Sequence, residues 1–161
     1  MILVVLGTWE MPFTRPLVEI EQAVTTGVMT ESILVQCGNT SYSSSSMRMV
    51  PFFAQAELEN LYQQASLVIC QAGVGSIMLG LRRRKKVIAI ARRRRFDEHI
   101  DDHQLEILEA FSRMGAILAW KGEGDLIDVL NKAKDFVGTE YLFGQEKIST
   151  AILNYLDSNV G

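Results

Sequence analysis

The sequence predicts a single α/β domain, doubly wound and Rossmann-like, with a mainly parallel sheet. Short apolar runs rich in valine and isoleucine alternate along the chain with segments that carry apolar residues at helical spacing. Each short run is apolar throughout, which is typical of strands buried on both faces of a parallel sheet. The 161 residues, 48% of them hydrophobic, suffice for one well-filled core. We therefore expect one domain that spans residues 1–161.

The first strand and the first helix follow directly from the N-terminus. Ile2–Leu6 is a β-branched apolar run that Gly7 ends, so it is predicted as a buried strand. Pro12 and Pro16 suit the first turn of a helix, and Gly27 suits its end. The residues expected on the inward face of this helix are Phe13, Leu17, Ile20 and Val24.

A second strand, an edge strand and a second helix come next. Ser32–Gln36 is a second apolar run, and the polar segment 39–46 after it is predicted as a loop. Met47–Phe53 is predicted as a strand at an edge of the sheet, because Pro51 has no N–H group to donate to a neighbour. Ala54–Ala65 has helical spacing.

The middle of the chain contains a glycine-rich turn between a strand and a helix. Ser66–Cys70 is predicted as the fourth strand, and the turn 71–76 leads into a helix that ends near Arg82. Val87–Ala91 is predicted as the fifth strand, followed by a long helix from about Asp101 to Met114.

The last third is predicted to add one strand and two helices. Ala116–Trp120 is the sixth apolar run, and Asp125–Val137 and Gln145–Leu156 are amphipathic. No run is long enough for a membrane span, and the N-terminus lacks the basic region of a signal peptide. We expect a cytoplasmic protein.

Charge is segregated along the chain. Nine of the sixteen lysines and arginines lie between Arg82 and Arg95, in a window without acids, although the net charge is only -3. The group 82–86 is expected at a helix end, away from the chemistry. The group 92–95 is expected at the functional edge of the sheet, facing phosphates or anionic lipid, or simply solvent. No aromatic residues are interleaved as in a nucleic-acid-binding module.

The two cysteines, Cys37 and Cys70, are predicted to be free buried thiols. They lie in or beside apolar runs, far apart, and without the spacing of metal ligands. This usage is typical of a reducing compartment.

The carboxyl ends of the strands are the expected ligand site, because parallel sheets bind ligands there at helix N-termini. Gly7 and Thr8 follow the first strand, and Gly73, Gly75 and Ser76 follow the fourth. Glycines let the backbone approach a phosphate, and a helix N-terminus offers free N–H groups to it. A tight turn without a ligand is the alternative interpretation. The turn is not a P-loop, and no acidic residue stands at the spacing of a dinucleotide site.

The segment 92–104 gathers both histidines of the chain with four acids. His99 and His103 could bind zinc, although a third ligand at a usual spacing is missing. Asp101 and Asp102 could bind a metal, although the Asp-x-Asp form of nucleotide-sugar sites is absent. In a third hypothesis, carboxylates and an amide recognise sugar hydroxyls without a metal. In the alternative without a ligand, one of the two aspartates only caps the helix. The residues of the third hypothesis are Glu98, Asp102 and Gln104.

These residues resemble a known family. Cys70–Gln104 is similar to the donor-binding half of family 28 glycosyltransferases, with its Ala-Gly-x-Gly-Ser turn and downstream Asp-Asp-His-Gln. The longer string Arg92–Glu106 resembles the bacterial exopolysaccharide branch. There a small soluble catalytic subunit (PssE type) pairs with a membrane-associated subunit (PssD type). The eukaryotic counterpart is the soluble half of the split transferase that adds the second N-acetylglucosamine to the dolichol-linked oligosaccharide.

The resemblance implies the C-terminal half of a GT-B fold and an inverting transfer from a UDP-sugar without a metal or other cofactor. It implies a hexose, galactose favoured, and a polyprenyl-diphosphate-linked glycan acceptor in exopolysaccharide or capsule synthesis. The subunit would be peripheral at the inner face of the cell membrane through its partner. The implied donor-binding residues are Gly7, Thr8, Gly73, Gly75, Ser76, Arg92, Asp102, His103 and Gln104, and the implied catalytic residues are His99 as general base and Glu98.

The chain also departs from the family pattern. Gln71 stands where a histidine is common, Leu79 where an acidic ribose contact is common, and Ala91 where a proline is common. The usual Gly-Lys-Pro is replaced by residues 84–86. These departures keep two other functions open, a noncatalytic nucleotide-sugar-binding partner of another transferase and a nucleotide-binding regulatory module.

Overall fold

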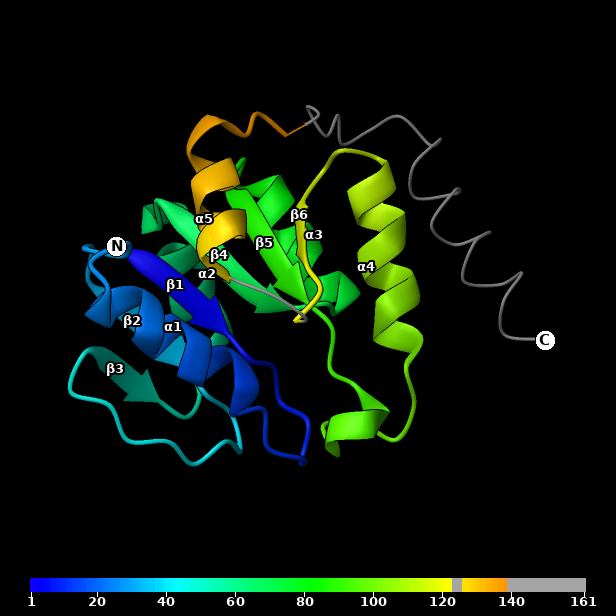
Figure 1. Cartoon of the computed structure of the whole chain (residues 1–161), viewed down its shortest axis with the longest axis horizontal. Coiled ribbons are helices and arrows are strands. Elements are labelled where there is room, and N and C mark those ends of the chain that lie inside the picture. The colour runs from blue at the N-terminus through cyan, green and yellow to red at the C-terminus, as the bar shows by residue number, and fades with distance from the viewer. Residues whose placement is uncertain (123–125, 139–161) are drawn as a thin grey trace.

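The computed structural model describes residues 1–122 and 126–138, which form a six-stranded parallel sheet covered by helices (Figure 1). The strand order is β3-β2-β1-β4-β5-β6, so the chain reverses its direction of winding between β1 and β4. The predicted fold class is confirmed. The strands are β1 (Ile2–Val5), β2 (Ile33–Gln36), β3 (Met47–Val50), β4 (Leu67–Gln71), β5 (Lys86–Ile90) and β6 (Leu118–Trp120).

The helices divide between the two faces of the sheet. In Figure 1, α1 and α5 lie in front of the sheet, and α2 and α3 lie behind it. The helices are α1 (Arg15–Thr25), α2 (Gln55–Gln64), α3 (Val74–Arg82), α4 (His103–Arg113) and α5 (Leu126–Asp135), with a short 3-10 turn η1 (Arg94–Phe96). The predicted helix over 145–156 lies outside the described residues.

The alternation of side chains along β1 supplies two separate cores. Ile2 and Val4 face a core that includes Leu17 of α1, whereas Leu3 and Val5 face the other core, on the side of α2, α3 and α4. Because the strand is apolar on both sides, both helical layers can bury their apolar faces against it.

Two strands are at least two residues shorter than predicted, for local reasons. The third strand ends at Val50, and the backbone N–H of Gly38 then donates to the carbonyl of Pro51. The sixth begins only at Leu118, because the N–H of Ala116 donates to the carbonyl of Phe111 and closes α4 instead of pairing in the sheet. Apolar runs thus predict burial better than they predict pairing.

Both cysteines are free and buried, as predicted. Burial raises the pKa of the Cys70 thiol to about 12, so this thiol is protonated and unreactive at neutral pH. Within residues 1–122 and 126–138, no helix has the length and apolar character that a bilayer crossing needs.

Candidate functional site

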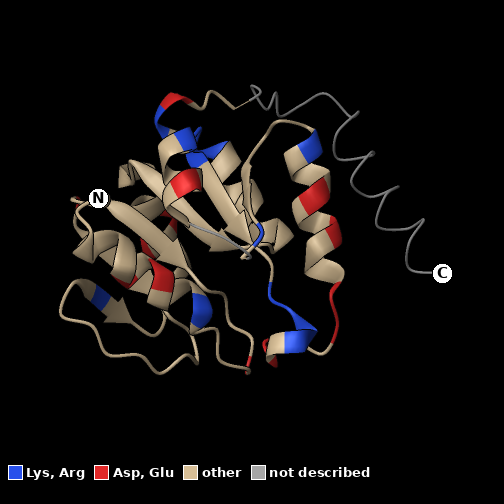
Figure 2. Cartoon of the chain, viewed as in Figure 1, with Lys and Arg blue, Asp and Glu red and all other residues tan. Residues whose placement is uncertain are grey.

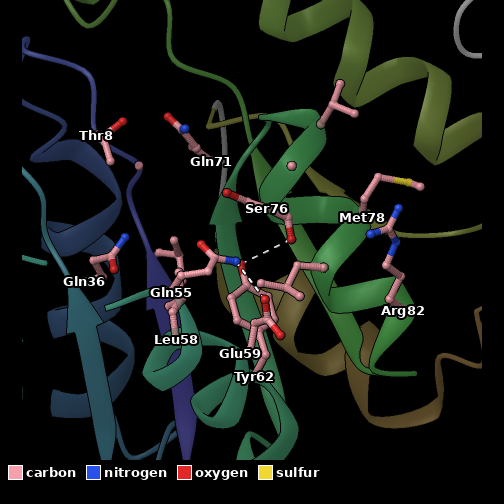
Figure 3. Close-up of a pocket in the computed structure, with 15 residues that line it drawn as sticks. Thr8, Gln36, Gln55, Leu58, Glu59, Tyr62, Gln71, Ser76, Met78 and Arg82 are labelled. Carbon is pink, nitrogen blue, oxygen red and sulfur yellow. Dashed lines mark hydrogen bonds between the residues drawn. The ribbon is translucent and has the colours of Figure 1, made fainter. Parts of the chain in front are cut away.

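A cavity of about 690 Å³ opens at the carboxyl ends of β1, β2 and β4, between α2 and α3. It lies where the strand order reverses, the usual place for a ligand in such a sheet. Figure 3 shows Thr8, Gln71 and Ser76 on one side of it and Gln55, Glu59 and Tyr62 on another. The lining residues are Val5, Gly7, Thr8, Gln36, Gln55, Leu58, Glu59, Tyr62, Gln71, Val74, Gly75, Ser76, Met78, Leu79 and Arg82.

Gly7 is the residue that the turn after β1 requires. Its φ is +79°, and a Cβ added there would lie 2.1 Å from Nε2 of Gln71. Any other residue would be strained by its backbone and would also displace Gln71. The turn therefore brings backbone, without a side chain, to the mouth of the cavity.

The start of α3 presents its backbone to the same cavity. Gly73 is the N-cap residue and no side chain caps the helix, so the first-turn amides keep their donor capacity for a ligand. A Cβ added at Gly75 would meet nothing within 4 Å, which shows open space in front of this turn. The arrangement suits a phosphate or diphosphate, which gains from several N–H donors and from the positive end of the helix.

Tyr62 fixes α2 against α3. Its hydroxyl donates to the carbonyl oxygen of Ser76 at 3.2 Å, and burial raises the pKa of the phenol well above its usual range. Its ring is fully buried and contributes to the wall of the cavity. The width of the cavity therefore depends on this contact.

A carboxylate on α2 lines the cavity and has not been singled out from the sequence. Nε2 of Gln55 donates to one oxygen of Glu59 at 2.9 Å, and Arg83 pairs with the other oxygen at 2.9 Å. The hydrogen bond from Gln55, with the contact to Arg83, lowers the pKa of Glu59. Glu59 is therefore ionised at neutral pH and keeps lone pairs for a hydroxyl donor.

The expectation that the basic group 82–86 lies away from the site is wrong for its first residue, because Arg82 lines the cavity. Arg83 also reaches the site, since it pairs with Glu59, whereas Lys85 and Lys86 lie as predicted. Lys85 donates to the carbonyl of Gln63, and Lys86 donates to the carbonyls of Ala133 and Lys134. In Figure 2 the basic residues of η1 lie apart from those beside the end of α5.

Arg92 lies in the interior of the domain, with only 1% of its surface exposed. Its guanidinium donates to four oxygens: Oε1 of Gln71 and the carbonyls of Leu6, Met11 and Glu98, at 2.7 to 3.0 Å. Burial lowers its pKa to about 10, partly offset by the nearby charge of Glu98. Arg92 thus joins three loops at this edge instead of facing the cavity.

Glu98 and Gln104 are also buried and partnered. Glu98 accepts two hydrogen bonds from Arg15, at 2.9 and 2.7 Å, and one from the backbone N–H of Arg93. Oε1 of Gln104 accepts the backbone N–H of Arg92 at 3.0 Å. Both side chains hold the loop between β5 and α4 in place.

The remaining predicted residues of this loop differ in exposure. His99 is 6% exposed and stacks against Trp9, with ring centroids 4.6 Å apart. His103 and Asp102 are exposed. Asp102 accepts the backbone N–H of Arg94 at 3.0 Å, which with Arg93 lowers the pKa of this carboxyl.

The structure therefore divides the predicted site residues into two groups. One group borders the cavity: Gly7, Thr8, Gly75 and Ser76, with Gly73 at the cap of α3. The other belongs to the segment between β5 and α4 and is absent from the lining of the cavity: Arg92, Glu98, His99, Asp102, His103 and Gln104. Both groups lie at the carboxyl edge of the sheet.

Comparison with solved structures shows what the fold is similar to. MurG of Acinetobacter baumannii aligns over 96% of this chain and 41% of its own, at 17% identity and a TM-score of 0.57. ALG13 aligns over 93% of both chains, at 17% identity and a TM-score of 0.57. The glycotransferase of kitacinnamycin aligns over 83% of this chain and 35% of its own, at 17% identity and a TM-score of 0.58. The chain thus spans less than half the length of the MurG chain.

Sequence comparison gives the family. No curated protein matches the chain. Residues 1–136 match the family described as the glycosyltransferase family 28 C-terminal domain. Because this match covers both the cavity and the segment 92–104, the chain belongs to the glycosyltransferase family 28 C-terminal domain family.

Proposed function

We propose that this chain is the donor-binding, catalytic subunit of a two-component glycosyltransferase of the PssE type. It would transfer a hexose, galactose favoured, from a UDP-sugar to a lipid-linked saccharide in exopolysaccharide or capsule synthesis. The observation that carries the proposal is the cavity between the uncapped start of α3 and the Gly7 turn. Both sides offer backbone at the position where a nucleotide diphosphate gains most from N–H donors.

The diphosphate would lie against Gly75 and Ser76 of α3, with Gly7 and Thr8 opposite. Because Gly75 has open space in front of it, the phosphate oxygens can approach the backbone directly. Charge develops on UDP as it leaves, so the positive end of α3 stabilises the departing group. Arg82, from the far end of the same helix, adds a cation to the cavity wall.

Glu59 is the candidate partner for the ribose hydroxyls. The family often places an acid at the position of Leu79, and here Leu79 lines the cavity as an apolar residue. Glu59 lines the same cavity from α2, is ionised, and can accept hydroxyl protons. The acid is thus supplied by the neighbouring helix, and Leu58 and Met78 offer apolar surface to the base.

The sugar would reach the segment between β5 and α4, where Asp102 and His103 are exposed and can accept or donate to hydroxyls. In the transfer, the acceptor hydroxyl oxygen attacks the anomeric carbon while the bond from that carbon to the diphosphate oxygen breaks. The electron pair leaves with UDP, and the hydroxyl proton passes to a general base. His99, which is only 6% exposed, is one candidate for this base, and the partner subunit is the other possible source.

A membrane-associated partner of the PssD type would bring the acceptor to this edge. Several large hydrophobic residues are exposed in the loops there, among them Trp9, Phe96 and Ile100. Exposed apolar groups of this kind, beside the arginines of η1, suit contact with another subunit. The same contact would hold the subunit at the inner face of the cell membrane.

UDP binding by the full chain, measured by calorimetry, tests the donor site. Gly75→Ala should fold, because the added Cβ meets no neighbour, and Gly75→Val adds two more carbons at the same position. Both substitutions fill the space proposed for the diphosphate. We expect a graded loss of UDP affinity, reaching about 10- to 100-fold for valine, the equivalent of one charge-assisted hydrogen bond. Ala56→Val on exposed α2, outside the cavity lining, is the matched control and should bind UDP normally.

Turnover tests the activity itself. A panel of UDP-sugars is offered to the chain with membranes that hold the partner, and UDP release is measured. Transfer that requires both components, with one preferred hexose, supports the proposal. UDP binding without turnover of any sugar would identify a noncatalytic partner subunit instead, and absence of UDP binding would exclude the donor site.

A further inference from the structure

Three metal-ligating side chains converge in the segment before α4. Nδ1 of His99 lies 2.9 Å from Oδ1 of Asp101, and Nδ1 of His103 contacts the same oxygen. The ligating atoms of all three residues lie within 4.8 Å of one another. The spacing is that of a short loop, with ligands at positions 99, 101 and 103.

The contact between His99 and Asp101 needs a proton or a metal ion between its two atoms. The backbone N–H of Asp101 donates to Nδ1 of His99 at 3.3 Å, so this nitrogen presents a lone pair. The carboxylate oxygen 2.9 Å away presents lone pairs as well, because an ionised aspartate only accepts. Two acceptors at this separation repel unless a proton or a metal ion lies between them.

The sequence indicates the two histidines and Asp101 only as separate metal hypotheses, and the structure brings all three together. Two histidines four residues apart gave an incomplete zinc set, and Asp101 stands at neither of the usual spacings. The chain at 101 turns before α4 begins, which brings the carboxylate between the two imidazoles. Two imidazoles and one carboxylate form the three-ligand set of zinc sites that keep an open position.

The site is also held in shape. Trp9 stacks on His99, and the two imidazoles contact each other edge to face with centroids 4.9 Å apart. Stacking on a buried ring fixes the direction of its nitrogen, as the outer partners of metal ligands do. His99 is itself buried, whereas Asp101 and His103 face solvent, so an ion can enter and an oxygen ligand can complete its shell.

We propose that His99, Asp101 and His103 bind a divalent transition-metal ion, with zinc as the best match to two imidazoles and a carboxylate. The inference goes beyond the proposed function, which assigns no metal to the donor site and gives His99 and His103 other roles. Arg93 and the N-terminus of α4 place positive charge nearby, so the affinity should lie below that of closed structural zinc sites.

The chain offers a clean assay, because His99 and His103 are its only histidines and both cysteines are buried. The untagged full chain is titrated with Zn²⁺ by calorimetry and with Co²⁺ by visible absorption, at about pH 7.5 where imidazoles are neutral. We expect one ion per chain, a Co²⁺ band that reports nitrogen ligation, and a melting temperature that rises with Zn²⁺.

Variants assign the ion to the three residues. Asp101→Asn and His103→Gln change exposed side chains, so the fold should survive, and each should weaken Co²⁺ binding by more than about tenfold. Asp97→Asn removes a carboxylate of the same loop outside the cluster and should leave binding unchanged. Absence of Co²⁺ binding, or binding that Asp101→Asn does not weaken, would overturn the proposal. So would an NMR spectrum in which Nδ1 of His99 keeps a proton with excess Zn²⁺, because that proton then fills the gap.

Discussion

Replacing Arg92 with methionine should destabilise the whole carboxyl edge of the sheet. The guanidinium donates to Gln71 and to three backbone carbonyls from two other loops, and it lies 4.6 Å from the ring centroid of Phe13. Methionine fills a similar volume and keeps the packing on Phe13 but donates nothing. Four oxygens would then lose their donor, and water cannot replace it at the two buried contacts, to the carbonyls of Leu6 and Glu98.

The expected loss follows from these contacts. A buried carbonyl that loses its donor costs about 1–3 kcal/mol, so two such carbonyls and two part-buried oxygens should together cost about 3–5 kcal/mol. In a domain of this size each kcal/mol lowers the melting temperature by roughly 2–4 °C. Arg92→Met should therefore lower it by roughly 6–20 °C.

Urea denaturation followed by circular dichroism measures the free energy of unfolding. Arg94→Met is the matched control, because Arg94 lies in the same run of arginines but is exposed, and it should change stability by no more than about 0.5 kcal/mol. If Arg92→Met lost less than about 1 kcal/mol, or no more than Arg94→Met, the buried network would not hold the loops as argued.

Three further predictions concern α2, α3 and the loop before α4. Tyr62→Phe removes the hydroxyl that donates to Ser76 and should cost about 1 kcal/mol in urea denaturation, with weaker UDP binding by calorimetry. Gly80→Ala places a Cβ 2.6 Å from Cγ2 of Val87 and should cost about 1–3 kcal/mol by the same assay, with partial recovery in the double variant with Val87→Ala. The folded pKa of Asp102 is lowered mainly by the N–H of Arg94, so its stabilising effect is present at neutral pH and is lost as the pH falls below about 4. Asp102→Asn should make the urea midpoint flatter against pH in that acidic range, and an unchanged slope would contradict the assignment.

The sequence predicted the sheet because its strands are apolar on both faces. Ile2–Leu6 and Val87–Ala91 are short runs of apolar residues without a polar face, which is typical of buried parallel strands. The ends of strands do not follow from apolar character alone. Ala116 is buried like its neighbours, but its N–H donates to the carbonyl of Phe111 and not to β5. The composition of a run predicts whether it is buried, whereas its hydrogen-bond partners depend on where the rest of the chain lies.

The sequence predicts the part of the site that glycines form, but not the part that common polar residues form. Gly73 and Gly75 interrupt an apolar pattern, so the turn before α3 is visible in the sequence. Gln55 and Glu59 are common residues for an exposed helix, and only the approach of α3 makes them part of a cavity. Tyr62 is equally inconspicuous until its hydroxyl meets α3.

The run of four arginines shows the same limit more sharply. Because all four residues are arginines, the sequence alone does not distinguish Arg92, which is buried, from Arg94, which is exposed. The difference arises because Arg92 directly follows the buried end of β5, where the carbonyls of Leu6 and Met11 face it across the sheet edge. A charge pattern thus indicated the edge but not the role of each charge.

Arg92 also explains how Gln71 can stand where the family often has histidine. A guanidinium only donates, so it holds Oε1 of Gln71 and leaves Nε2 on the side of Gly7 and Gly73. Gln71 lines the cavity, and its free N–H groups then face the place proposed for the diphosphate. A histidine would have to accept from Arg92 with one nitrogen and donate with the other, so it would serve only in one neutral tautomer. The amide provides both functions without titrating, and a buried arginine outside the cavity thereby orients a donor inside it.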